Sequence, residues 1–261
     1  MKQIIKKGSF FTLMFMLLGC LSLYAADNDL ITKQITIQLE KAGTLPDRIG
    51  SSRKYTITNL KIIGEINGTD LKMIREMAGR DYRGNSTYGK LSVLDLSEAK
   101  IVEGGACYYY ENRNNGYYTS NDVIGDYAFE DCSGLTSLTL PAGITSIGER
   151  AFRGCSGLTS IYVYAEKVPK IDSDAFEGCD AKKCTLYIPM GTYDDYWISD
   201  FGYYFENIVE FDATGIDKTT TSTDVEEVAR YSVNGQRLSA PTKGLNIVKY
   251  SDGSVKKVAV R

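Results

Sequence analysis

The chain contains no histidine among its 261 residues. This absence excludes Ser–His and Cys–His nucleophilic pairs and every metal site built on imidazole. No Cys-x-x-Cys pair is present either, so the usual cysteine ligand spacing for zinc is missing. Carboxylate chemistry survives these exclusions, because Asp and Glu are plentiful. We expect a protein that is not an enzyme, with no catalytic residue, no cofactor and no metal.

Clustered positive charge is also lacking. Lys and Arg number 30 against 33 Asp and Glu, which gives a formal net charge of -3. No run of Lys or Arg forms a basic stripe. Affinity for nucleic acid depends largely on clustered cations that neutralise phosphates. The composition therefore predicts no nucleic-acid partner.

The first 25 residues are typical of a signal peptide. Lys2, Lys6 and Lys7 precede an apolar run over residues 10–18, and residues 23–25 offer a small-residue cleavage site. An alternative is a lipobox over residues 18–20, with Cys20 lipidated and the protein an outer-membrane lipoprotein. Either route predicts export to the cell surface or the extracellular space. No later stretch is apolar enough to span a membrane.

Two segments, residues 124–141 and 147–163, align without gaps. The Ala-Phe pair at 128–129 recurs at 151–152, a step of 23, and at 175–176, a step of 24. A fixed period in the twenties indicates stacked coils, each of which cannot bury its apolar face alone. We expect the three Ala-Phe pairs to share one core.

Each coil also carries an L-x-x-L-x-L pattern, which predicts a short strand. The matching positions are Ile57, Leu60 and Ile62; Leu91, Leu94 and Leu96; Leu135, Leu138 and Leu140; and Leu158, Ile161 and Val163. Successive strands would pair in parallel, with the Ala-Phe positions on the opposite wall of the core. The predicted fold is an α/β or mostly β solenoid of leucine-rich repeats, 23–24 residues long, with a parallel sheet.

Cys132, Cys155 and Cys179 occupy one register of the repeat. Parallel side chains about 4.8 Å apart suit a disulfide poorly, because its Cβ atoms prefer about 3.8 Å and convergent directions. We interpret these cysteines as small buried apolar residues. A local bridge between Cys179 and Cys184 remains an alternative in an oxidising compartment.

Segments 124–141 and 147–163 resemble the BspA-like leucine-rich repeats of bacterial surface proteins. The resemblance covers about residues 40–212. Asp172 departs from the pattern where Gly is expected, and Lys182-Lys183 stand where Leu is expected, which suits a terminal coil. Family members are implicated in binding host matrix or other bacterial cells. The resemblance therefore implies a surface binding protein.

The domain organisation follows from these patterns. A strand is expected over residues 55–63 and a helix over 71–78, with Gly79 at its C-cap. The tail resembles the sorting domains of the type IX secretion system, with a small accessory β module as the alternative. The expected parts are a signal peptide, 1–25; an N-terminal cap region, 27–90; a solenoid with terminal cap, 91–212; a linker, 213–223; and a C-terminal β tail, 224–261.

Tyrosines are concentrated where the repeat is interrupted, between residues 101 and 123. We expect a long projecting loop there, whose tyrosines either pack on neighbouring coils or bind a ligand. The ligand-binding candidates are Tyr108, Tyr109, Tyr110, Tyr117 and Tyr118. A second aromatic cluster around Trp197 is interpreted as a C-terminal cap, with a carbohydrate platform as the alternative.

The sequence thus predicts an exported surface binding protein or adhesin for host or bacterial macromolecules. Expected partners are an extracellular protein or glycan, and the export and sorting machinery through both termini. One alternative is a carbohydrate-capturing surface protein. Another is a secreted hydrolase with paired carboxylates, but pairs such as Glu130-Asp131 fall at repeat positions typical of a solvated edge.

Overall fold

The computed structural model describes residues 30–112, 115–213, 227–232, 236–250 and 255–260. The chain divides into two compact units, residues 1–213 and 214–261. The predicted signal peptide and most of the predicted linker lie outside the described residues. No helix in the described part is long and apolar enough to cross a membrane.

An eight-stranded parallel sheet runs along the first unit in the order β1-β2-β3-β8-β10-β12-β13, and β4 also pairs with β2. Equivalent apolar residues face one another across neighbouring strands: Leu60, Leu94, Leu138, Ile161 and Leu186. All five are fully buried. The strand bounds are β1, Ile35–Leu39; β2, Asn59–Ile66; β3, Val93–Asp95; β4, Ala99–Ile101; β8, Ser137–Thr139; β10, Ser160–Tyr162; β12, Thr185–Pro189; and β13, Asn207–Phe211.

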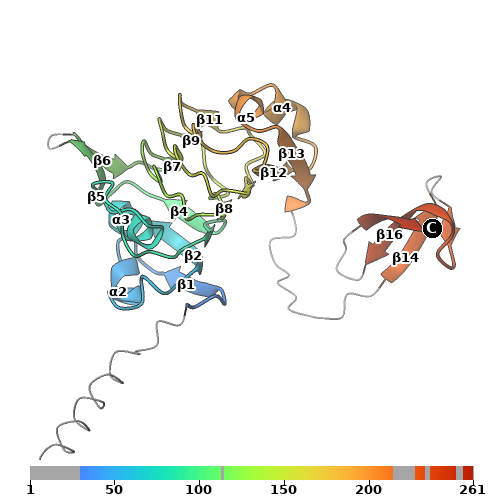
Figure 1. Cartoon of the computed structure of the whole chain (residues 1–261), viewed down its shortest axis with the longest axis horizontal. Coiled ribbons are helices and arrows are strands. Elements are labelled where there is room, and N and C mark those ends of the chain that lie inside the picture. Colours follow the sequence, from blue (N-terminus) through green and yellow to red (C-terminus); the bar gives the residue numbers. More distant parts are fainter. Residues whose placement is uncertain (1–29, 113–114, 214–226, 233–235, 251–254, 261) are drawn as a thin grey trace, which may run out of the picture. The chain divides into compact units, whose positions relative to one another are not determined.

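A second, three-stranded sheet forms the opposite wall of the stack, which Figure 1 shows on the far side of the coils from β8 and β12. Its parallel strands are β7 (Val123–Ile124), β9 (Ser146–Ile147) and β11 (Lys170–Ile171). The mostly parallel sheets fit the repeat fold predicted from the sequence. The eight-stranded sheet begins before residue 91, where we expected the solenoid to start. Its strands β1 and β2 lie in the region that we assigned to an N-terminal cap.

The Ala-Phe pairs are buried between the two walls, as the repeat predicts. Phe129 and Phe152 are fully buried and Phe176 is 2% exposed. The Phe152 ring stacks between the other two, with centroids 5.4 Å and 5.1 Å apart. Along this wall each coil bonds to the next through its backbone, as where the Phe129 amide donates to the Ala151 carbonyl at 2.7 Å.

The cysteines from Cys107 to Cys184 are all free thiols. Cys132 and Cys155 are fully buried, as expected for small apolar residues, and Cys179 is half-buried. The Cys155 thiol donates to the Phe129 carbonyl at 3.1 Å. The alternative of a bridge between Cys179 and Cys184 is therefore not observed in this structure.

The described part of the first unit also contains α3 and three short helices. They are α2 (Leu45–Ile49), α3 (Gly68–Met77), α4 (Tyr193–Trp197) and α5 (Asp200–Tyr204). Helix α3 starts three residues before the predicted position, because Asn67 and Asp70 form a capping box. Gly79 follows the C-cap residue Ala78 at φ +101°.

The last coil ends against α4 and α5. Tyr196, Phe201 and Phe205 are buried there, and the Phe205 ring lies 5.0 Å from Phe176. Part of the aromatic cluster is available to solvent: Tyr193 is 39% exposed, Trp197 50% and Tyr203 85%. Burial of the other rings agrees with their interpretation as a cap over the last coil.

The second unit is an antiparallel sheet in the order β15-β14-β16-β17. Its strands are β14 (Glu227–Ser232), β15 (Arg237–Leu238), β16 (Gly244–Tyr250) and β17 (Val255–Val260). Residues 251–254, between β16 and β17, lie outside the described residues. Within this sheet the Arg230 guanidinium binds the side chains of Glu227 and Asn246.

Candidate functional site

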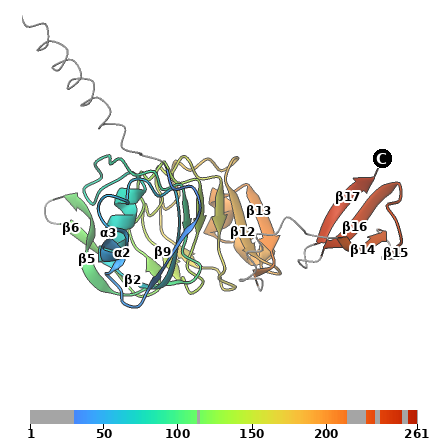
Figure 2. The same cartoon turned by 90° about the horizontal axis from the view of Figure 1, so that it is seen from below.

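The tyrosine-rich segment is a β-hairpin and not the projecting loop that we expected. Strands β5 (Gly104–Asn112) and β6 (Asn115–Thr119) pair in antiparallel fashion beside α3, at the N-terminal end of the stack in Figure 2. The Ala106 amide donates to the Thr69 hydroxyl at 2.9 Å. A Cβ on Gly68 would lie 2.0 Å from the Ala106 carbonyl oxygen, so glycine is required for this approach.

Tyr108 belongs to the core, and its expected availability to a ligand is wrong. The side chain is 1% exposed, and its hydroxyl donates to the Asp126 carbonyl at 2.9 Å. Burial raises the pKa of this phenol well above its ordinary value. Asp126 lies one repeat before Glu149, whose carbonyl accepts from the Tyr127 amide of the preceding coil. The Asp126 carbonyl thus accepts from the Tyr108 hydroxyl, at the position where the carbonyl of the next coil accepts from a backbone amide.

Tyr109 and Tyr117 form a cross-strand pair that packs on the first Ala-Phe coil. The Tyr109 ring stacks on Tyr127 with centroids 5.1 Å apart, and its hydroxyl donates to Glu130 at 2.7 Å. Tyr117 lies 4.9 Å from the same Tyr127 ring. Burial, followed by the Glu130 carboxylate, raises the pKa of Tyr109. These contacts match the alternative in which the tyrosines pack on neighbouring coils.

Of the five candidates, Tyr118 has an exposed side chain, at 56%, whereas Tyr110 is half-buried like Tyr109 and Tyr117. The Tyr110 ring meets Tyr82 edge to face, with centroids 5.9 Å apart. The Tyr110 amide also donates to the Tyr82 carbonyl at 2.7 Å, which ties the hairpin to the segment after α3.

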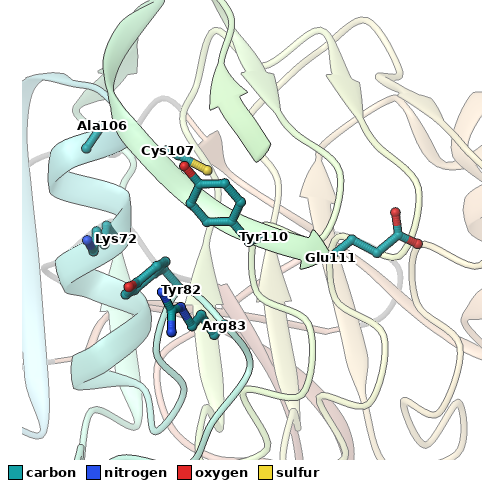
Figure 3. Close-up of a pocket in the computed structure, with 7 residues that line it drawn as sticks. All are labelled: Lys72, Tyr82, Arg83, Ala106, Cys107, Tyr110 and Glu111. Atoms are coloured by element: carbon teal, nitrogen blue, oxygen red, sulfur yellow. The ribbon is translucent and has the colours of Figure 1, made fainter. Parts of the chain in front are cut away.

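Tyr110 forms one wall of a groove of about 810 Å³ between α3 and the hairpin (Figure 3). Helix α3 contributes Lys72, the segment after it contributes Tyr82 and Arg83, and β5 contributes the remainder. The complete lining is Lys72, Tyr82, Arg83, Ala106, Cys107, Tyr110 and Glu111. Its volume lies in the range of about 300–1,000 Å³ that is typical of ligand sites.

The charges of the groove are predominantly positive. The Lys72 ammonium lies 3.9 Å from the Tyr82 ring centroid, and the Arg83 guanidinium lies 5.2 Å from it. In the described part of the chain neither cation forms an ion pair. The Glu111 carboxylate accepts hydrogen bonds from the Tyr117 and Tyr127 hydroxyls, each at 3.3 Å, and in Figure 3 it points away from the cations.

The segment after α3 is held by Asp81. Its carboxylate accepts from the Arg83 amide at 2.8 Å and the Asn85 amide at 2.9 Å. Burial opposes ionisation, but hydrogen bonds from Asn85 and Arg83 outweigh it and hold the pKa of Asp81 below its ordinary value. The ionised carboxylate therefore organises the turn that carries Tyr82 and Arg83.

Sequence reasoning missed Lys72, Tyr82 and Arg83. A signal was present in the run Arg80-Asp81-Tyr82-Arg83, where cations flank a tyrosine. Nothing in the pattern of α3 distinguishes Lys72 from any other half-buried lysine of an amphipathic helix. The return of the segment after α3 to that helix brings the three side chains together, through the contacts of both cations with the Tyr82 ring.

Two further aromatic groups lie on the first unit. On the sheet, the Tyr162 and Tyr187 rings stack with centroids 4.4 Å apart. At the terminal coil, Tyr193 and Trp197 have parallel rings 6.1 Å apart. Within the described residues, no group of three or more His, Cys, Asp or Glu side chains could hold a metal ion.

These features describe a stack of repeated coils with parallel sheets and a polar, cationic groove at its N-terminal end. Residues 122–200 match the family model described as a BspA type leucine rich repeat region (6 copies). The chain thus contains a BspA-type leucine-rich repeat region, in agreement with the resemblance of its repeats. No curated protein matches the chain. The groove residues precede the matched segment, so this similarity does not extend to the groove.

Proposed function

We propose that the protein is an exported surface binding protein or adhesin, and not an enzyme, whose ligand lies in the groove between α3 and the hairpin. A BspA-type repeat region is consistent with such a role. The observation that carries the proposal is the groove itself, where unpaired cations and tyrosine rings meet at the interruption of the repeat. The ligand is a macromolecule of a host or of another bacterium.

Point variants test this proposal better than removal of the hairpin. Deletion would also remove Tyr108, which is core. Tyr110→Ala should weaken binding of the displayed protein to its target surface by at least about thirtyfold, the loss typical of an aromatic anchor worth about 2 kcal/mol. Tyr203→Ala is the matched control, because Tyr203 is 85% exposed on the terminal coil.

The screen would compare host matrix proteins, glycans and whole bacterial cells as targets. Unchanged binding by folded Tyr110→Ala would contradict the groove assignment. A loss with Tyr187→Ala instead would move the site to the sheet, where Tyr187 stacks on Tyr162. Circular dichroism of each variant separates a lost contact from a lost fold.

Export through the N-terminal segment is part of the proposal. Mass spectrometry of the mature protein should find a start at or near Ala26 or Asp27. A diacylated Cys20 would instead make the protein a lipoprotein.

We also propose that the C-terminal sheet is an address for a sorting system. Removal of residues 224–261 should then leave the protein inside the cell envelope, and normal surface display of the truncated chain would refute this role.

A further inference from the structure

We infer that the groove recognises an anionic sugar, one that carries a carboxylate or a sulfate. The inference rests on the proposed function and specifies its ligand class. It starts from the placement of Lys72 and Arg83 on one tyrosine ring, Tyr82. Two positive charges close together repel each other, so an arrangement without a carboxylate partner favours binding of an anion.

Three carboxylates near the groove, those of Glu111, Asp81 and Glu76, have partners other than Lys72 and Arg83. Glu111 accepts hydrogen bonds from Tyr117 and Tyr127. Asp81 accepts from the amides of its own turn. Glu76, also on α3, pairs with Lys54. A ligand anion would therefore meet two cations without displacing a carboxylate.

The cations are also partly ordered before a ligand arrives. Contact with an aromatic ring stabilises a cation and restricts its position, and both Lys72 and Arg83 contact the ring of Tyr82. Tyr82 is itself held by the Tyr110 ring and by the Tyr110 amide. Ordered side chains lose less entropy on binding, which favours affinity.

Size and composition favour a sugar over a protein surface. The groove has a volume of about 810 Å³, within the range of about 300–1,000 Å³ that is typical of sites for small ligands, so the end of a saccharide chain fits it. Its walls carry phenol hydroxyls and aromatic edges beside the charges, a combination that can bond sugar hydroxyls and pack against the ring carbons. The end of an acidic glycan chain fits this combination of charge and size.

The test measures binding to the full mature chain by calorimetry. The probes are a galacturonic acid trisaccharide, a sulfated galactose trisaccharide and the uncharged galactose trisaccharide. At least one anionic probe should bind at least about tenfold more tightly than the neutral one, the gain of one charge-assisted contact. Raising the salt to about 1 M, where the Debye length falls to about 3 Å, should remove most of that advantage.

Variants locate the binding. The double variant Lys72→Gln, Arg83→Gln should weaken the anionic probe by about a hundredfold, about tenfold for each lost charge. Lys41→Gln, Arg53→Gln changes the net charge equally at exposed residues outside the groove lining, and should leave the affinity unchanged. The comparison of carboxylated and sulfated probes identifies which anion the groove prefers.

Equal affinity for the neutral trisaccharide, or an unaffected double variant, would overturn the inference. Tighter binding of a glutamate hexapeptide than of either anionic sugar would overturn it in favour of a protein ligand. The proposed function can survive that failure: Tyr110→Ala would still abolish adhesion while the charge variant retained it. Both proposals fail if neither variant affects adhesion.

Discussion

Arg75 offers the sharpest test of how the stack of coils is closed at its N-terminal end. This arginine of α3 is fully buried, and its Nη1 donates to the carbonyls of Tyr127 at 2.6 Å and Ala128 at 2.9 Å. Ala128 lies one repeat before Ala151, whose carbonyl accepts from the amide of the preceding coil. The Arg75 guanidinium thus donates to the Ala128 carbonyl, as the backbone amide of a preceding coil donates to Ala151.

Replacement by Met keeps the apolar stem and removes the donors. The Ala128 carbonyl then lacks a partner, at a cost of about 1–3 kcal/mol, while the Tyr127 carbonyl keeps the Glu130 amide at 3.2 Å. The stacking of the guanidinium on Tyr109, 4.8 Å from the ring centroid, is also lost. Relief of the buried charge offsets part of this cost. We expect a net loss of about 1–3 kcal/mol, which is set mainly by the carbonyl left without a donor.

The assay is urea unfolding followed by tryptophan fluorescence. Trp197 is the only tryptophan and lies in the terminal coil, so it reports whether the loss at Arg75 spreads through the whole repeat unit. Arg80→Met is the matched control, because its half-buried side chain donates to the Asp131 carbonyl at 3.1 Å. We expect about 1 kcal/mol or less for the control. A loss at Arg75 under about 1 kcal/mol, or no larger than the control, would refute the reasoning.

Three further predictions concern the core and the hairpin. Phe152→Ala should lower the free energy of unfolding by about 3–5 kcal/mol, against about 0.5 kcal/mol or less for exposed Tyr203→Ala; a loss under about 1 kcal/mol in urea would mean that the phenylalanine stack is not core. Gly68→Ala should separate the hairpin from α3, since the new Cβ would lie 2.0 Å from the Ala106 carbonyl, and unchanged hydrogen exchange at the Ala106 amide would contradict this. Burial raises the pKa of Cys132 from 9.0 to about 11, so the protonated thiol favours the folded state and its stabilisation is lost as the pH rises from 9 towards 11. Denaturant midpoints across that range should fall less in Cys132→Ala than in the parent, and parallel curves would show that this thiol does not titrate on unfolding.

The period of the sequence determined the positions of the coils. Residues spaced by 23 or 24 must occupy equivalent places in a stack, so the burial of Phe129, Phe152 and Phe176 followed from spacing alone. The helix expected over residues 71–78 was equally visible, because its pattern is local, although the capping box of Asn67 and Asp70 starts it three residues earlier. Such features depend on neighbours along the chain or on exact repetition.

Tertiary structure alone decided what the tyrosines and cations do. Tyr108 and Tyr110 stand two residues apart in one strand, yet one donates into the core and the other lines the groove. Lys72 meets the Tyr82 ring where the segment after α3 returns to the helix, and Arg75 reaches a carbonyl 53 residues away. The physical reason is that a buried backbone carbonyl needs a hydrogen-bond donor and accepts the one that the fold brings near. The spacing of residues in the sequence does not indicate which donor that is.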